Sequence, residues 1–248
     1  MAAKGLIVLL LLFAAGAGAQ ELPPVATTVV PVVGSTFGVS MARWLTDVEL
    51  INDTGSPADV AIELTSVPDA PVFFLTLAPG QVQRFTDIVG QAFGLESALS
   101  PLRVSTGGRR PITVRANAYA VGGDGISPLQ HIGVYGADTW FPMRVLDNLA
   151  FSDELRTNIG LANLGDRDAD FLLALQRVPG RNVAVTYRRV APGELHHISI
   201  QSLFPLITAG SGFSVVIETG SRQTHVYASV IRNSDNGAAF VAPRFGVR

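Results

Sequence analysis

The sequence predicts an all-β protein of two tandem immunoglobulin-like antiparallel β-sandwich domains, each with one short helix. Three observations predict this fold. Short segments alternate between apolar and polar residues, turn-forming residues separate them, and the order of segments occurs twice. About seven strands in roughly 105 residues match an immunoglobulin-like sandwich in size. The chain has no cysteine, so the disulfide of true immunoglobulin domains is absent and the prediction concerns the architecture alone.

The repeat consists of six blocks that recur in the same order roughly 110 residues later. The clearest pair is 45–52 with 156–163, and the next is 77–80 with 190–193. The remaining pairs are 30–32 with 141–143, Phe93 with Phe204, 102–105 with 213–216, and 114–117 with 226–229. We therefore expect two domains, residues 24–138 and 139–248.

Within each block the apolar side chains recur at every second residue, which is the period of a strand with one buried face. Thr46, Val48 and Leu50 illustrate this pattern, as do their counterparts Thr157 and Ile159. Further strands are expected at 72–77, 82–85, 102–106 and 113–119, and at 183–188, 195–198, 213–219 and 224–232. A short helix in each half is expected after the N-cap residues Thr86 and Ser199.

The N-terminus has the pattern of a signal peptide. Lys4 precedes an apolar run at 6–15, and Ala17, Gly18 and Ala19 form a small-residue cleavage pattern. We expect residues 1–19 to be removed between Ala19 and Gln20. The alternative is a transmembrane anchor, but the run is short for ~30 Å of hydrocarbon. The expected location is secreted (extracellular, cell surface or periplasmic), with no membrane insertion after signal removal.

The composition narrows the partners and the chemistry. Acidic residues number 20 against 18 basic ones, and Lys4 is the only lysine. This balance argues against nucleic acid as a partner. The absence of cysteine excludes thiol catalysis, zinc–thiolate sites and iron–sulfur clusters. We expect no cofactor.

Four histidines, His131, His196, His197 and His225, are the first candidates for a metal site. His196 and His197 are adjacent on a predicted strand, so their side chains point to opposite faces and do not easily chelate one ion. His225, on a predicted neighbouring strand, could join one of them. The expectation is that there is no metal site.

The run 166–170 superficially matches a calcium loop. Such a loop needs glycine at its sixth position and an acid at its twelfth, where this chain has Phe171 and Arg177. We interpret the run as a solvated turn.

The usual signatures of catalysis are missing. The Gly-Ser-Gly segment at 210–212 is shorter than the Gly-x-Ser-x-Gly pattern of a nucleophile elbow. The Gly-rich loop 122–125 precedes no predicted helix, so it does not match a phosphate-binding loop. Asp47 aligns with Asn158 and Glu49 with Gly160, so neither acid is kept in both copies. We expect no catalytic residues and no enzyme activity.

Exposed aromatic rings would favour sugar binding. Trp44 opens a predicted strand and Trp140 lies where the two predicted domains meet. Packing in the core and at the junction is the favoured interpretation of both, and a stacking platform for sugars is the alternative.

The succession Thr46-Asp47-Val48, Ala78-Pro79-Gly80, the helical segment 85–94 and Leu102-Arg103-Val104 resembles tandem β-sandwich modules found in secreted proteins of Acidobacteria and similar environmental bacteria. The resemblance covers nearly all of the chain after residue 19. It implies export and the fold, and no site residues, because that family has no established activity. We expect a non-catalytic structural or interaction module acting in surface structure, adhesion or assembly, with an unknown protein or glycan partner. A carbohydrate-binding module is the alternative.

An apolar segment containing proline occurs three times, at 29–33, 140–143 and 240–243. Proline lacks an N–H donor and therefore suits sheet edges, where chains can pair. Two repeats need only two copies, so either the middle strand serves both domains, or each end of the molecule carries one copy that a neighbouring molecule could use for self-association. The alternative is that both terminal strands pair inside their own domain.

Overall fold

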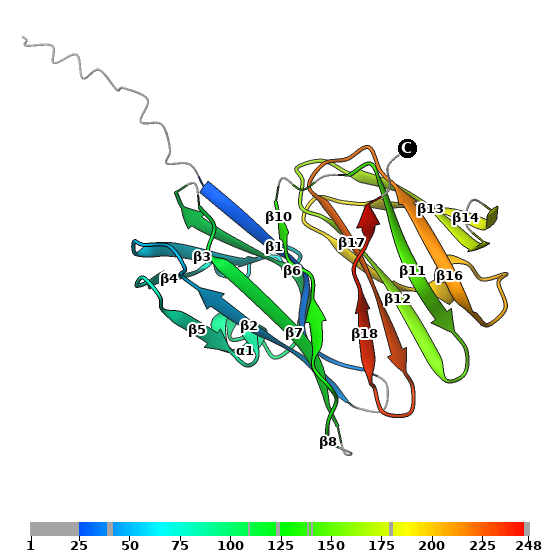
Figure 1. Cartoon of the computed structure of the whole chain (residues 1–248), viewed down its shortest axis with the longest axis horizontal. Helices are drawn as coiled ribbons and strands as arrows, with labels where there is room; N and C mark the ends of the chain where they lie inside the picture. Colours follow the sequence, from blue (N-terminus) through cyan, green and yellow to red (C-terminus); the bar gives the residue numbers. More distant parts are fainter. Residues whose placement is uncertain are drawn as a thin grey trace, which may run out of the picture.

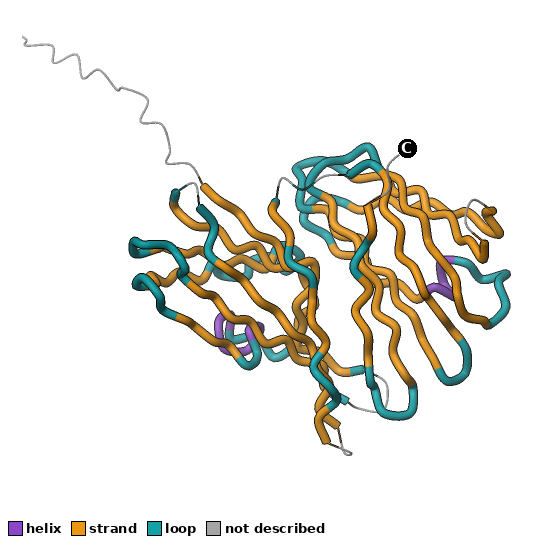
Figure 2. The backbone as a smooth tube through the Cα atoms, viewed as in Figure 1, coloured by secondary structure: helices purple, strands orange, loops and turns teal. Residues whose placement is uncertain are grey.

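The computed structural model describes residues 25–38, 42–108, 110–122, 125–137, 139, 141–178 and 181–245. The expected signal peptide, with Ala19 and Gln20, lies outside the described residues, as do Trp140 and the middle of the loop 122–125. The described residues are almost entirely antiparallel strands with two short helices, as Figures 1 and 2 show. This confirms the predicted all-β fold class.

The first half of the molecule, up to residue 137, holds a ten-stranded sheet in the order β4-β3-β6-β1-β2-β7-β8. Strand β10 pairs with β1, β5 with β2, and β9 with β7. The strands are β1 (Val25–Phe37), β2 (Arg43–Ile51), β3 (Ala58–Leu64), β4 (Phe73–Leu77), β5 (Val82–Phe85), β6 (Ala98–Gly107), β7 (Thr113–Gly122), β8 (Gly125–Ile126), β9 (Gln130–Ile132) and β10 (Tyr135–Gly136). Strand β1 passes between two layers, because most of it pairs with β6 and its last residues, Thr36 and Phe37, pair with β2.

The second half, from residue 139 onward, has a five-stranded sheet in the order β14-β13-β16-β11-β19 and a four-stranded sheet in the order β15-β12-β17-β18. Its strands are β11 (Met143–Phe151), β12 (Leu155–Asn163), β13 (Ala169–Val178), β14 (Arg181–Val190), β15 (Leu195–Ser199), β16 (Gly210–Glu218), β17 (Thr224–Arg232), β18 (Ala238–Val241) and β19 (Arg244–Phe245). The orders β4-β3-β6-β1 and β5-β2-β7 of the first half thus have the counterparts β14-β13-β16-β11 and β15-β12-β17.

Each half buries its own apolar core between two layers of strands. Thr46, Val48 and Leu50 of β2 are buried and face Val60 and Ile62 of β3 across the first core. In the second half the equivalent buried side chains are Thr157, Ile159 and Leu161 of β12, with Phe171, Leu173 and Leu175 of β13. The two-residue alternation predicted from the sequence is therefore confirmed, although several strand ends differ by a few residues.

One buried asparagine closes the same turn in each half. Asn52 donates from Nδ2 to the carbonyls of Ser56 and Leu77, both at 2.8 Å. Asn163 donates to the carbonyls of Arg167 at 2.7 Å and Val190 at 3.0 Å. In both turns the asparagine Oδ1 accepts a backbone N–H two residues later. These bonds satisfy backbone carbonyls that would otherwise be buried without a partner.

The two helices are α1 (Ile88–Phe93) and α2 (Ile200–Leu203). Ser199 caps α2 as predicted, because its side chain accepts from the N–H of Ser202. The predicted cap Thr86 is wrong: Asp87 caps α1 by accepting from the N–H of Gly90 at 3.1 Å. A carboxylate at this position satisfies a free helical N–H and complements the helix dipole. Neither helix in the described part of the chain has the length and apolar character needed to span a membrane.

The terminal strands both pair within the chain. Strand β1 has hydrogen-bonded neighbours on two sides, and β18 pairs with β17 at the edge of the four-stranded sheet. Pairing of β18 therefore leaves one side of that strand as a sheet edge. Self-association through the terminal strands stays a prediction.

Candidate ligand-binding cleft

The two halves lie side by side, with the outer face of the four-stranded sheet turned toward the first half (Figure 1). A small apolar cluster at this junction contains Val29 of β1, with Ala162 and Leu164 from the other half. Two hydrogen bonds between described residues cross the junction. Ser66 donates from Oγ to the carbonyl of Gly193 at 2.6 Å, and Arg103 donates from Nη2 to the carbonyl of Leu164 at 3.2 Å. The junction is thus held by apolar packing and by direct polar contacts.

Buried polar side chains lie beside this apolar cluster. Arg144 donates to the hydroxyl of Thr224 at 3.1 Å and to its carbonyl at 2.8 Å. The ring of His225 lies 5.6 Å from that of Tyr135, and its Nε2 is buried with no hydrogen-bond partner in the described structure. Burial lowers the pKa of His225 to about 4, assisted by the charge of Arg144. His225 is therefore neutral at neutral pH.

A row of three cross-strand partners faces the first half. His197 of β15 and Tyr227 of β17 are both paired with Gly160 of β12. The Tyr227 ring lies over Gly160, where a Cβ atom would come within 1.9 Å of a ring carbon. The same ring stacks on Phe240 at 5.4 Å. The Tyr227 hydroxyl and His197 Nδ1 are 2.8 Å apart and share a hydrogen bond. Glycine at position 160 is what allows this aromatic ring to lie flat on the sheet.

Next to this row, a cleft of about 420 Å³ separates the two halves. One wall comes from β1, β2, β7 and β9, and includes Val32, Trp44, Leu45, Ala118 and Ile132. The opposite wall comes from β12, β15, β17 and β18, and includes Arg156, Asn158, His197, Tyr227, Ser229, Ile231 and Phe240. The volume lies within the range of roughly 300–1,000 Å³ found for small-molecule sites, which are likewise mostly apolar with a few polar groups.

Four of the polar side chains that line the cleft can still bond a ligand. Asn158 and the indole N–H of Trp44 make no hydrogen bond that the structure describes, and Ser229 is also at the wall. His197 lines the cleft and is exposed, and partial desolvation by the surrounding protein atoms lowers its pKa to about 4. A neutral imidazole, an amide and a hydroxyl can orient a ligand without adding charge.

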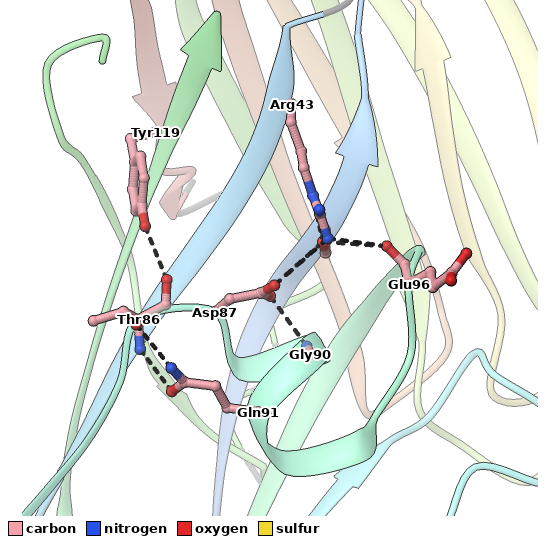
Figure 3. Close-up of polar contacts among 8 residues, drawn as sticks. Arg43, Thr86, Asp87, Gly90, Gln91, Glu96 and Tyr119 are labelled. Atoms are coloured by element: carbon pink, nitrogen blue, oxygen red, sulfur yellow. Dashed lines mark hydrogen bonds and ion pairs between the residues drawn. The ribbon is translucent and has the colours of Figure 1, made fainter. Parts of the chain in front are cut away.

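A second polar cluster joins helix α1 to the edge of the first half, as Figure 3 shows. Arg43 donates to the carbonyl of Glu96 at 3.2 Å and lies 3.8 Å from the Asp87 carboxylate. Thr86 and Gln91 bond twice to each other, at 3.0 and 2.9 Å. Each of these polar groups bonds to or pairs with another group of the same cluster, so we assign the cluster a structural role in holding α1 in place.

Two titratable groups near α1 have shifted pKa values. The Tyr119 hydroxyl donates to the carbonyl of Thr86 at 2.8 Å (Figure 3), and burial raises its pKa to about 12. Burial also raises the pKa of Asp47, whose Oδ1 is buried without a hydrogen-bond partner in the described structure. Perturbed pKa values cluster at functional sites but also occur in structural networks, and the charges of Asp87 and Glu49 contribute to the raised pKa of Asp47.

The other side chains named from the sequence lie apart. His131 is exposed on β9, and His196 contacts Glu194 at 3.3 Å, on the opposite face of β15 from His197. Strand β12 separates β15 from β17, so His225 is not on a strand adjacent to the histidine pair. No group of three or more potential metal ligands occurs among the described residues. Gly210 to Gly212 open β16, and in the run 166–170 residues 166–168 form a turn while 169–170 begin β13.

Sequence reasoning reached Trp44 and His197 but did not connect them, and it missed Arg156 and Tyr227. One signal was available. Gly160 replaces Glu49 and Tyr227 replaces Arg115 at matching positions of the two halves. A charged pair exchanged for a glycine and an aromatic indicates that one sheet face is covered in the second half.

Comparison of this chain with protein-family models, with curated proteins and with solved structures found no match. The cleft must therefore be interpreted from its own geometry.

Proposed function

We propose that this chain is an exported, non-catalytic interaction module, and that the cleft between its two halves is its binding site. The halves would be two tandem immunoglobulin-like domains, residues 24–138 and 139–248, in a protein that acts in surface structure, adhesion or assembly. The matching strand orders and the paired turns of Asn52 and Asn163 support the tandem arrangement.

The single observation that carries the binding function is the cleft itself. One wall belongs to the first half and the other is the outer face of the four-stranded sheet, and apolar surface dominates both. Apolar surface left in contact with water is costly, at ~25 cal/mol per Å². A ligand that fills the cleft would remove that contact on both walls at once and would stabilise the observed arrangement of the halves.

The test is binding of a neutral solvatochromic dye such as Nile red, compared between two matched variants. Ala118 lines the cleft, so Ala118→Trp fills it with an indole ring. Ala174 lies on β13 and is not part of the cleft wall, so Ala174→Trp is the control. We expect saturable binding by the wild-type protein, at least tenfold weaker binding by Ala118→Trp, and unchanged binding by the control. Equal binding by both variants would contradict the proposal.

Export has its own test. Secreted protein analysed by mass spectrometry should begin at Gln20, because the small-residue pattern at Ala17–Ala19 directs cleavage after Ala19. Membrane-bound protein that still carries Met1 would argue for an anchor instead.

Carbohydrate binding is the second candidate, and one observation favours it. Phe74 of β4 and Tyr187 of β14 occupy matching positions on the edge strands of the two halves and are 73% and 48% exposed. Exposed rings on a sheet can stack on sugar rings. Glycan-array binding that is lost in a Phe74→Ala and Tyr187→Ala double variant would support this function, whereas binding that persists in the double variant would exclude these rings.

A further inference from the structure

Arg156 is the only charged side chain among the described residues that line the cleft. It extends from β12 on the outer face of the four-stranded sheet, with Asn158 two residues further along the same face. An isolated cation beside apolar surface is unfavourable unless a partner compensates its charge. The partners of Arg156 therefore indicate what the cleft is built to receive.

Within the described structure, those partners are neutral amides. Arg156 donates from Nη1 to Asn233 Oδ1 at 2.7 Å and from Nη2 to Asn236 Oδ1 at 2.9 Å. The nearby carboxylate of Asp235, in the same β17–β18 turn, is instead paired with Arg232 at 2.9 Å. Arg156 forms no ion pair with any carboxylate of the described residues. The turn thus holds the guanidinium in place without neutralising it.

A guanidinium has five N–H donors in a fixed plane, and the two amides occupy two of them. The remaining donors can bind a carboxylate, with which arginine makes short, charge-assisted and often paired hydrogen bonds. Both amide acceptors also fix the orientation of the group before a ligand arrives. Such preorganisation reduces the entropy lost on binding.

We propose that the cleft binds a small amphipathic anion, with its apolar body between the two halves and its carboxylate against Arg156. This inference rests on the cleft being the binding site. Leu45 and Ile231 contribute apolar surface to the two walls, so the body of the ligand contacts both halves. Asn158 and Ser229 supply neutral hydrogen-bonding groups for the second carboxylate oxygen or for a hydroxyl group.

The first experiment uses unaltered protein and three probes of equal chain length: decanoate, 1-decanol and decyltrimethylammonium. Isothermal titration calorimetry should show decanoate binding at least tenfold more tightly than decanol, and the ammonium more weakly than either. Equal affinities for decanoate and decanol would overturn the anion inference and leave the cleft proposal standing. Absence of binding by all three probes, together with absence of dye binding, would overturn both.

The second experiment compares Arg156 with an exposed arginine away from the cleft. Arg156→Met keeps a long apolar stem and removes the charge, and Arg181→Met makes the same change on β14, outside the cleft wall. We expect Arg156→Met to lose at least tenfold in decanoate affinity while decanol affinity is unchanged, and Arg181→Met to retain both. Decanoate affinity that is equally reduced in the two variants would show a general charge effect and contradict a specific contact. Circular dichroism should be used to check that each variant is folded. The comparison of the three probes uses unaltered protein and does not depend on either variant.

Discussion

Replacing Gly160 with alanine adds a single carbon atom to the row of His197, Gly160 and Tyr227 that faces the first half. The added Cβ would lie 1.9, 2.2 and 2.5 Å from three carbons of the Tyr227 ring. Restoring an ordinary contact of ~3.5 Å requires the ring to move by roughly 1.5 Å. Tyr227 is only 1% exposed and contacts Phe240 and His197, so that movement would disturb both of these contacts.

The size of the effect follows from opposing contributions. Overpacking of a filled site costs ~1–3 kcal/mol, and disturbing the hydrogen bond to His197 costs about 1 kcal/mol more. Alanine is more favourable than glycine in an unstrained strand by roughly 0.5–1 kcal/mol. The expected net loss of unfolding free energy is about 1–3.5 kcal/mol. With a urea m-value near ~1.5 kcal/mol/M, the midpoint should fall by roughly 0.7–2.3 M.

The assay is urea unfolding followed by circular dichroism, with two comparisons. Gly107→Ala is the matched control, because Gly107 also lies in a strand and its Cβ would meet nothing within 4 Å. In a Tyr227→Val background the ring is gone, so Gly160→Ala should become nearly neutral, which measures the coupling directly. If Gly160→Ala costs no more than Gly107→Ala, or keeps its full cost without the ring, the steric reasoning is wrong.

Two further predictions concern buried polar groups. Asn52→Ala and Asn163→Ala should each lower the unfolding free energy by ~2–4 kcal/mol, because two carbonyls lose their donor. The exposed Asn182→Ala should cost under ~0.5 kcal/mol by the same urea assay, and similar losses in all three would contradict the role of the turns. His225 has a pKa of about 4 in the folded protein against 6.5 ordinarily, so the unfolded chain binds the proton more readily. Stability should be complete above pH 6.5 and should decrease as the pH falls toward 4, by up to about 3 kcal/mol. His225→Gln should reduce that decrease between pH 6.5 and 4 without abolishing it, because burial also lowers the pKa of His197 to about 4, and an unchanged slope would show that His225 does not contribute.

The fold class and most strands could be predicted from the sequence, because side-chain alternation reports which residues of a strand are buried. Val48 and Leu50 follow that rule in β2, as Phe171 and Leu173 do in β13. The cap of α1 could not be assigned reliably, since Thr86 and Asp87 are adjacent and both can accept an N–H. The cleft could not be predicted at all. The alternation of apolar and polar side chains identifies the face of a sheet that is turned toward the core. Whether the other face is covered by a second part of the protein depends on residues far away in the sequence.

The outward faces of the two matching sheets show why the halves are not interchangeable. In the first half, the cross-strand row consists of three charged side chains joined by ion pairs at 2.7 and 3.9 Å: Arg84, Glu49 and Arg115. In the second half, the same row is His197, Gly160 and Tyr227.

In this structure the first half covers the row of His197, Gly160 and Tyr227. If another unit covered the charged row of the first half in the same way, three charged side chains would be removed from water. The desolvation of such groups costs several kcal/mol even when they are paired. A third unit therefore could not dock on the β5-β2-β7 face by the same geometry. We therefore expect that an array of this chain would not extend through the β5-β2-β7 face by the junction geometry described here.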